Sequence, residues 1–369
     1  MHRLISLRRM RKIYPAIPKR SLGMKQHLNE YYKIIYETTN LNMFSPTAEQ
    51  VLENKQLDGK TCLITGASSG LGLEAARCLA ASGCRVLAAS RNTYKGLNAT
   101  RDLGSGDLIQ VMELNLASLK SVNNFSEELI RNGNQLDMVL LNAGVFGVPW
   151  ARTEDGVETI FQVNFLGQLQ LLLGVERLLA PAARVVFVTS ESHRRVNWSP
   201  RDQICPREDM LSLPEHEYTS IKAYNISKLC SFLAMQYLAH RWRGSGRGVF
   251  CAHPGTFVKT QLCRHWWVYE ALYTAMKPFA KTIPQAAATP VYCATSDALA
   301  GKSTLYYKDC ARRAESDLAQ DSQLAFRVID LCRSMLSDRV GQAIDNPAVR
   351  PETAEVRDKQ EDEGLAAVS

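Results

Sequence analysis

The stretch Thr65-Gly66-Ala67-Ser68-Ser69-Gly70-Leu71-Gly72 decides the fold of this chain. An apolar run typical of a buried strand precedes it over residues 61–65, and a helical pattern follows it over 71–81. Glycines at such a turn let the backbone approach a pyrophosphate at the positive end of the helix. We therefore take as cofactor-binding candidates Gly66, Ser68, Ser69, Gly70, Leu71 and Gly72. A tight turn without any ligand is the alternative interpretation.

Short apolar runs alternate with helical stretches from about residue 60 onward. Strands are predicted over 61–65, 85–90, 108–114, 138–141, 184–189, 249–253 and 304–307, and helices over 71–81, 119–131, 157–179, 224–241 and 284–296. This order predicts an α/β fold with one Rossmann-type domain, a doubly wound parallel sheet that helices cover on both faces. Ligands of such sheets bind at the carboxyl ends of the strands.

The compact domain is expected over residues 46–340. Residues 1–45 form a basic leader, irregular or helical, and residues 341–369 read as a disordered acidic tail. The first 29 residues carry eight basic side chains and no acidic one. Removing these eight from the net charge of +7 leaves −1 for the rest, so a nucleic-acid partner is not expected.

The leader and the cysteines bear on location. Apolar residues on one side of the leader and basic residues opposite are typical of mitochondrial transit peptides and membrane-surface helices, and a solvated basic tail is the alternative. Ten cysteines occur singly, without the paired spacing of a zinc or redox centre, so no metal site is expected. Free thiols indicate a reducing compartment. We expect the cytoplasm, with the mitochondrion as the alternative.

The end of the second predicted strand bears on the cofactor. Ser90 and Arg91 stand there, and no acidic residue occurs between positions 85 and 101. A carboxylate at this point usually binds the ribose 2′-hydroxyl of NAD, whereas an arginine pairs with a 2′-phosphate. The sequence therefore favours NADP(H) over NAD(H). A plain surface charge is the alternative interpretation of Arg91.

The run Tyr224-Asn225-Ile226-Ser227-Lys228 places a phenol and an ammonium group four residues apart. This spacing puts both side chains on one face of a helix, where the cation lowers the pKa of a neighbouring phenol. Such a pair suits acid and base catalysis during hydride transfer to a carbonyl or from an alcohol. A second copy, Tyr273 to Lys277, lies in an aromatic stretch and is interpreted as a chance match.

The ordered set of motifs resembles the short-chain dehydrogenase/reductase family. The set consists of the glycine loop, Asn142-Ala143-Gly144 after a strand, Asn164, Ser190 and the Tyr224 to Lys228 pair. By this resemblance Tyr224 is the proton donor or acceptor, and Lys228 binds the nicotinamide ribose and lowers the tyrosine pKa. Ser190 and Tyr224 then bind the substrate oxygen, and Asn164 completes a proton relay through water.

The resemblance also implies further cofactor contacts. They involve Asn115 and Leu116 after the third strand, Asn142, Ala143 and Gly144, and Pro254 and Gly255 after the sixth strand. The family usually has an aspartate where Asn115 stands, but an asparagine oxygen still accepts from an adenine amino group. The gap between Ser190 and Tyr224 is long for the family, and its segment 198–218 is expected to form a substrate-facing flap.

The segment 256–283 bears on the substrate and the partners. It is rich in aromatic residues, which suits a flat apolar molecule such as a steroid or retinoid, while core packing or membrane-surface contact are the alternatives. Besides a small apolar substrate, peripheral membrane contact and a homodimer are expected. A WW module needs two spaced tryptophans, and all five tryptophans lie in the predicted catalytic domain, so no partners are expected through such a module.

Two hypotheses about function follow. The leading one is an NADP(H)-dependent oxidoreductase that interconverts an apolar carbonyl and alcohol. The other is a catalytically weak nucleotide-binding protein that acts as a regulator or scaffold in growth or apoptosis signalling.

Overall fold

The computed structural model describes residues 45–101, 103, 106–199, 204–255 and 280–340, and every structural statement below concerns these residues. The predicted tail, nearly all of the predicted leader and most of the aromatic segment 256–283 lie outside them, as do Tyr273 and Lys277.

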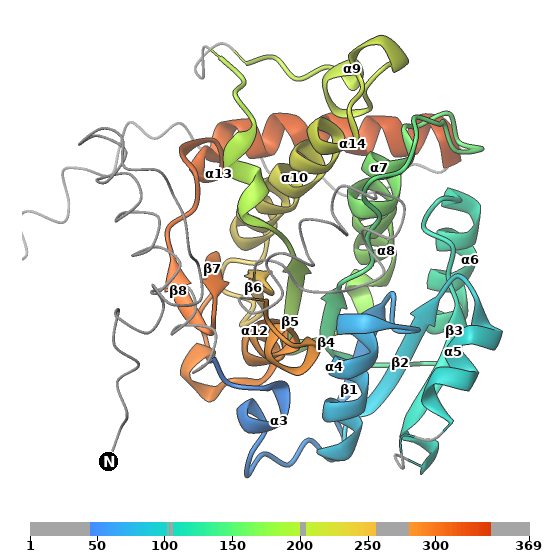
Figure 1. Cartoon of the computed structure of the whole chain (residues 1–369), viewed down its shortest axis with the longest axis vertical. Helices are drawn as coiled ribbons and strands as arrows, with labels where there is room; N and C mark the ends of the chain where they lie inside the picture. Colours follow the sequence, from blue (N-terminus) through green and yellow to red (C-terminus); the bar gives the residue numbers. More distant parts are fainter. Residues whose placement is uncertain (1–44, 102, 104–105, 200–203, 256–279, 341–369) are drawn as a thin grey trace, which may run out of the picture. The chain divides into compact units, whose positions relative to one another are not determined.

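One sheet of eight strands runs through the domain in the order β3-β2-β1-β4-β5-β6-β7-β8 (Figure 1). The strands are β1 Thr61–Thr65, β2 Arg85–Ser90, β3 Ile109–Glu113, β4 Leu136–Leu141, β5 Leu179–Val188, β6 Gly248–His253, β7 Leu305–Lys308 and β8 Ala311–Arg313. The pairings from β3 to β7 are all parallel, and the strand order reverses between β1 and β4. The predicted doubly wound parallel sheet is thus confirmed, and only β8 pairs antiparallel.

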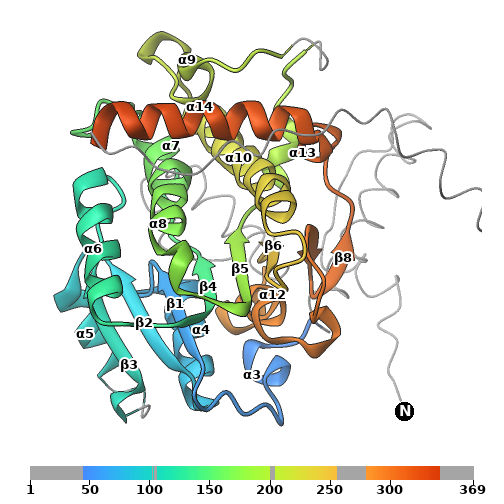
Figure 2. The ribbon, with the colours of Figure 1, turned by 180° about the vertical axis from the view of Figure 1, so that it is seen from behind.

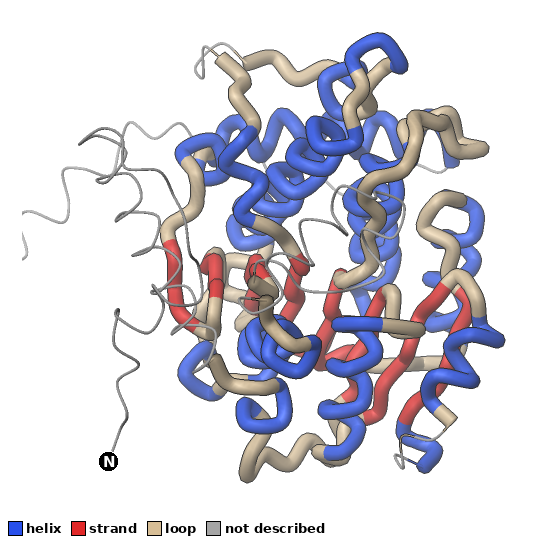
Figure 3. The backbone as a smooth tube through the Cα atoms, viewed as in Figure 1, coloured by secondary structure: helices blue, strands red, loops and turns tan. Residues whose placement is uncertain are grey.

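Longer helices cover both faces of this sheet, which Figure 3 shows in red between the blue helices. They are α4 Gly70–Ala81, α5 Thr93–Thr100, α6 Leu119–Arg131, α8 Gly167–Val175, α10 Ser220–Arg241, α12 Ile283–Thr295 and α14 Ser322–Val340. The shorter helices are α3 Ala48–Val51, α7 Thr159–Phe161, α9 Glu208–Leu211, α13 Asp317–Gln320 and the π-helix η2 Gln162–Leu166. Single 3-10 turns are η1 Gly106–Leu108, η3 Glu176–Leu178, η4 Glu191–Arg195, η6 Glu215–Glu217 and η9 Asp297–Leu299.

Two apolar cores result from the alternation of side chains along the strands. In β1, Leu63 faces the core under α6, α8, α10 and α14, while Cys62 and Ile64 face the core under α3, α4 and α12. Successive residues of a strand point to opposite faces, so each face of the sheet has an apolar core of its own. The helices on each face bury that core. The helix α14 lies across α10 on the first face (Figure 2), so α10 is buried on nearly every side.

The region around β5 differs from the prediction. The expected helix over 157–179 divides into α7, η2, α8 and η3, and β5 begins at Leu179 rather than at residue 184. Leucine and alanine in this stretch favour a helix, but Pro181 cannot continue one. The register of β4 against β5 also shifts between Leu136 and Met138, as expected where a proline interrupts a ladder.

None of the helices within these described ranges is long and apolar enough to span a bilayer.

Candidate functional site

The main cavity, of about 600 Å³, lies at the carboxyl ends of the central strands. Seven segments contribute to it: the glycine loop, the end of β2 with α5, the end of β3, the turn after β4, the start of the α7 and η2 helices, the end of β5, and α10. The lining residues are Gly66, Ser68, Ser69, Gly70, Leu71, Ala89, Ser90, Arg91, Asn92, Lys95, Leu114, Asn115, Leu116, Ala117, Asn142, Ala143, Gly144, Val145, Phe146, Val148, Thr159, Val163, Val188, Thr189, Tyr224 and Lys228.

The glycine loop can approach a ligand closely because it lacks side chains at three positions. Gly66 and Gly70 have φ of +70° and +57°, which favour glycine. A Cβ on Gly72 would lie 2.5 Å from the Gly66 carbonyl oxygen and 2.6 Å from Asn142 Nδ2. The Ser69 side chain makes no capping bond at the start of α4, so this helix end suits an anion.

The turn Asn142-Ala143-Gly144 is tied to the glycine loop through Thr65. The Thr65 hydroxyl oxygen accepts from the amides of Asn142 (2.9 Å) and Ala143 (3.0 Å) and donates to Gln168 Oε1 (2.9 Å). Asn142 Nδ2 donates to the Thr65 carbonyl at 2.9 Å. The side chain of Asn142 therefore ties the glycine loop to this turn, whose three residues all line the cavity.

The end of β2 carries two cations. Arg91 is exposed, and Lys95 follows one turn later on α5, which begins where Asn92 Oδ1 accepts from the Lys95 amide at 2.8 Å. The buried Ser90 donates its hydroxyl to the Asn92 carbonyl at 3.1 Å. No carboxylate stands among the described lining residues. This end of the cavity therefore suits a phosphate group.

Lys95 is a site residue that the sequence analysis missed. It stands in the first turn of α5, but Arg91 precedes the cap residue Asn92, so no helical spacing in the sequence linked the two cations. Close packing fixes α5 over the strands, because a Cβ on Gly96 would lie 2.8 Å from Val111 Cγ1 and 3.2 Å from Ser90 Oγ.

Asn115 and Leu116 line the cavity where β3 ends. The Asn115 Oδ1 atom already accepts from the Ala117 amide at 3.1 Å, and the Asn115 amide donates to Ser121 Oγ at 3.0 Å. One lone pair of Oδ1 thus stays available for the acceptor role that the sequence predicts.

Tyr224 and Lys228 meet in the cavity on one face of α10, as their spacing predicts. Lys228 Nζ lies 5.5 Å from the centroid of the Tyr224 ring and donates to the Val188 carbonyl at 2.8 Å. Burial lowers the pKa of the Lys228 ammonium to about 8. Phe146 packs edge-on against Tyr224 with 5.0 Å between ring centroids, so an aromatic wall borders the phenol.

Ser190 and Asn164 adjoin the cavity but do not line it. The Ser190 hydroxyl caps the turn η4, because its oxygen accepts from the Ser192 amide at 3.2 Å. Asn164 Oδ1 accepts from the Val145 amide at 2.7 Å, and its Nδ2 donates to the Val145 carbonyl and to Ser227 Oγ at 3.0 and 3.3 Å. The Asn164 side chain thus holds the loop after β4 against η2 and α10.

Pro254 and Gly255 follow β6 and also lie outside the lining. Gly255 has a φ of +112°, and a Cβ on it would lie 2.6 Å from Lys281 Cδ. The Lys281 side chain therefore lies against Gly255.

Part of the predicted flap 198–218 contacts the loop after β4, which borders the cavity. The last residue of the flap, Tyr218, donates its hydroxyl to the Val148 carbonyl at 2.6 Å, and Trp150 Nε1 donates to the Leu213 carbonyl at 3.0 Å. The cavity residue Val148 is thus held by a contact across 70 residues of sequence, and the cavity residue Phe146 lies two positions before it. The sequence analysis did not single out these two residues.

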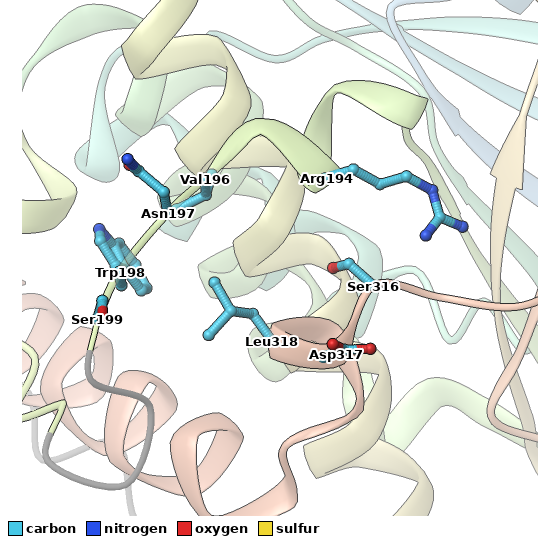
Figure 4. Close-up of a pocket in the computed structure, with 8 residues that line it drawn as sticks. All are labelled: Arg194, Val196, Asn197, Trp198, Ser199, Ser316, Asp317 and Leu318. Carbon is cyan, nitrogen blue, oxygen red and sulfur yellow. The ribbon is translucent and has the colours of Figure 1, made fainter.

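A second cavity, of about 440 Å³, lies beside η4 and the start of α13 (Figure 4). Its lining combines a cation, an anion, hydroxyls and apolar groups: Arg194, Val196, Asn197, Trp198, Ser199, Ser316, Asp317 and Leu318. No motif of the sequence indicated it.

An open α/β sheet with a glycine loop at its first strand, a cavity at the strand reversal and a partly buried tyrosine beside a buried lysine is the arrangement of a Rossmann-type oxidoreductase. The comparisons with known proteins agree. Residues 60–198 match the family model "short chain dehydrogenase". The chain belongs to the short-chain dehydrogenase/reductase family, whose fold implies binding of NAD(P)(H).

Similar proteins place the chain more closely. It is 40% identical over 301 residues to the WW domain-containing oxidoreductase of Drosophila melanogaster, covering 80% of this chain and 73% of that one. It is 36% identical over 291 residues to human retinol dehydrogenase 12, covering 78% and 89%. A crystal structure of an uncharacterized protein from Mycobacterium paratuberculosis matches with a TM-score of 0.63 and 27% identity, covering 78% and 97%.

Proposed function

We propose that this protein is an NADP(H)-dependent oxidoreductase that interconverts an apolar carbonyl compound and its alcohol, of the retinoid or steroid class. One observation carries the proposal. The Tyr224 phenol and the Lys228 ammonium line the same cavity as the glycine loop and the cations Arg91 and Lys95. Similarity to a protein named retinol dehydrogenase 12 supports the retinoid class.

The residues around the cavity fit a dinucleotide. A loop that rejects a Cβ at Gly72 and an uncapped start of α4 suit the pyrophosphate. Arg91 and Lys95 suit a 2′-phosphate, and Asn115 and Leu116 suit the adenine. When bound, the nicotinamide supplies or accepts the hydride. The residues of this chain orient the two reactants and move the proton.

Tyr224 is proposed as the group that donates a proton to the carbonyl oxygen during reduction and removes it during oxidation. Lys228 stabilises negative charge on the phenolic oxygen, since its ammonium group is 5.5 Å from the ring in a buried setting. Ser190 is proposed to hydrogen-bond the same substrate oxygen through its hydroxyl. Asn164 is proposed to support proton relay from its place between Val145 and Ser227.

The apolar side chains beside Tyr224 favour an apolar substrate. Phe146, Val148 and Val163 line this end of the cavity, and the Phe146 ring is in edge contact with Tyr224. A flat polyene or ring system buries apolar area against such a wall, while its one carbonyl reaches the phenol.

The test is NADPH oxidation by the full chain with all-trans-retinal and with a panel of steroid ketones. We expect turnover that Tyr224→Phe lowers by at least about a hundredfold, because the proton donor is lost, with the Kd for NADPH unchanged. The matched control is Tyr292→Phe on α12, outside the cavity, which keeps wild-type turnover.

Equal turnover in Tyr224→Phe would overturn the assignment of the proton donor. Tight NADPH binding without turnover on any carbonyl would instead favour a nucleotide-binding protein without a catalytic role.

A further inference from the structure

Ser190 lies between two segments that fix its position relative to α10: the end of β5 before it and the turn η4 after it. On one side, Lys228 Nζ donates to the Val188 carbonyl at 2.8 Å, and the Thr189 hydroxyl donates to the Lys228 carbonyl at 3.5 Å. On the other side lies η4, whose third residue is His193. The position of Ser190 relative to α10 therefore depends on what fixes η4.

His193 is the buried residue that fixes this turn. Its side chain is fully buried, and its Nδ1 lies 2.8 Å from the Ser190 carbonyl oxygen. The backbone amide of His193 donates to the same oxygen at 3.3 Å. On the far side of the ring, Nε2 accepts from the Ser316 amide at 3.2 Å.

These partners determine the protonation of the ring. A carbonyl oxygen only accepts, so Nδ1 must carry a hydrogen, and a backbone amide only donates, so Nε2 must have a lone pair. The imidazole is therefore neutral with its hydrogen on Nδ1. Burial also lowers the pKa of His193, which favours the same neutral form at physiological pH.

The ring of His193 is also stacked on α10. It lies against Phe232 with 4.0 Å between centroids and 30° between planes. Tyr224, Lys228 and Phe232 follow one another at intervals of four residues and so share one face of this helix. The face that presents the phenol and the ammonium thus also presents the ring on which His193 rests.

We propose that His193 is a positioning residue: stacked on Phe232 and bridging Ser190 to Ser316, it sets the distance from the Ser190 backbone to Tyr224. The inference rests on the proposed oxidoreductase function. Ser316 lies on the second cavity, on a segment facing η4 (Figure 4), so the bridge joins two segments 123 residues apart. His193 itself touches no reacting atom.

Three substitutions separate the parts of this role. His193→Asn keeps a donor near the place of Nδ1, His193→Gln keeps an acceptor near the place of Nε2, and His193→Phe keeps the stacked ring alone. The matched control is His240→Asn, on α10 outside both cavities.

Kinetics with NADPH and all-trans-retinal test the link to Ser190. We expect His193→Gln and His193→Phe to lower kcat by about tenfold or more, because small displacements of reacting groups cost that much, with the Kd for NADPH unchanged. His193→Asn keeps the donor to the Ser190 carbonyl but loses the stacked ring and the acceptor for Ser316, so it should lower kcat less than the other two variants do. A residue that only stabilises the fold would lower thermal stability in all three variants, with no advantage for asparagine, and this result would overturn the proposal.

Amide hydrogen exchange tests the bridge without any turnover. The Ser316 amide should exchange slowly in the wild type and in His193→Gln, and faster in His193→Asn and His193→Phe, which lack its acceptor. Equal exchange in all four proteins would overturn the bridge. Absence of turnover in the wild type would count against the proposed function alone, because the exchange pattern does not depend on it.

Discussion

The two ends of the main cavity are held together in different ways. At the glycine loop, close backbone approach decides the geometry, since Gly66, Gly72 and the turn at Asn142 leave no room for added atoms. At the Tyr224 end, side chains decide it, through the hydroxyl of Tyr218 and the buried ammonium of Lys228. Adding atoms at the glycine loop should therefore weaken NADPH binding. Removing polar atoms at the Tyr224 end should change stability and turnover instead.

The largest effect is expected from adding one methyl group at the glycine loop. In Gly72→Ala the new Cβ would lie 2.5 Å from a backbone oxygen, which cannot rotate away. We expect the glycine loop to move away from this contact and to lose its fit to the cofactor. A cost of about 3 kcal/mol for this movement corresponds to about a hundredfold loss of NADPH affinity. Fluorescence titration with NADPH measures it.

The matched control for this change is Gly244→Ala. Gly244 has a φ of +78°, and no atom lies within 4 Å of the place that a Cβ would take, so alanine there adds backbone strain without a clash. Both variants should lose some stability, but only Gly72→Ala should lose NADPH. Equal affinity in the two variants would contradict the role assigned to close approach.

The next effect concerns the cations at the end of β2. Arg91→Ala and Lys95→Ala should each weaken NADPH binding by about tenfold, because a charge-assisted hydrogen bond is worth about 1.5–3 kcal/mol. NADH binding should stay unchanged, and added salt should narrow the difference between the two cofactors. Lys120→Ala, an exposed cation on α6, is the control. A parallel loss of NADH affinity would show that the two residues do not read the 2′-phosphate.

A smaller effect should appear in the pH dependence of stability at the Tyr224 end. Burial lowers the pKa of Lys228 to about 8, against an ordinary value of 10.5 in the unfolded chain. Between these values the unfolded chain binds more protons, so the contribution of Lys228 to the free energy of unfolding rises with pH. Lys228→Met removes this contribution.

Urea unfolding without cofactor measures this pH dependence. The stability advantage of Lys228→Met over the wild type should shrink by about 1 kcal/mol between pH 7.5 and pH 9. Buried cysteines that also titrate in this range are common to both proteins and cancel in the difference. A difference that does not change with pH would mean that the ammonium is not destabilised by burial.

The smallest effect is expected from Tyr218→Phe. The substitution leaves the Val148 carbonyl without its donor, which should lower the free energy of unfolding by about 1 kcal/mol and kcat/KM for the carbonyl substrate by about threefold. The Kd for NADPH should not change. Burial raises the pKa of Tyr218 to about 12, so the hydroxyl donates throughout the working range. A change in NADPH affinity would break the distinction between the two ends of the cavity.

Sequence reasoning predicted β1, β2, β3, β6 and the glycine loop well because they depend on short-range patterns. An apolar run followed by a glycine triplet and a helical period predicts β1, the loop and α4 within one residue. Tyr224 and Lys228 meet for the same local reason, their helical spacing.

Other features depend on contacts that no local pattern contains. The strand β8 pairs with β7 only because a tight turn follows Lys308, and its three residues have no apolar alternation. The hydroxyl of Ser190 points to its own turn η4, a choice between rotamers that the sequence does not decide. The use of the Asn164 amide on Val145 likewise depends on the η2 helix, which no motif announced.

The contacts of the Thr65 hydroxyl bear on the order in which the chain folds and on its resistance to proteolysis. It joins the end of β1 to the turn after β4, 77 residues later, so the dinucleotide cradle forms only once the centre of the sheet has closed. Such long-range parallel pairing forms slowly, because loop closure must precede it. A ligand of the cradle would bind only the closed chain and stabilise it by mass action. The supply of dinucleotide would then govern how long each molecule escapes proteolysis in the cell.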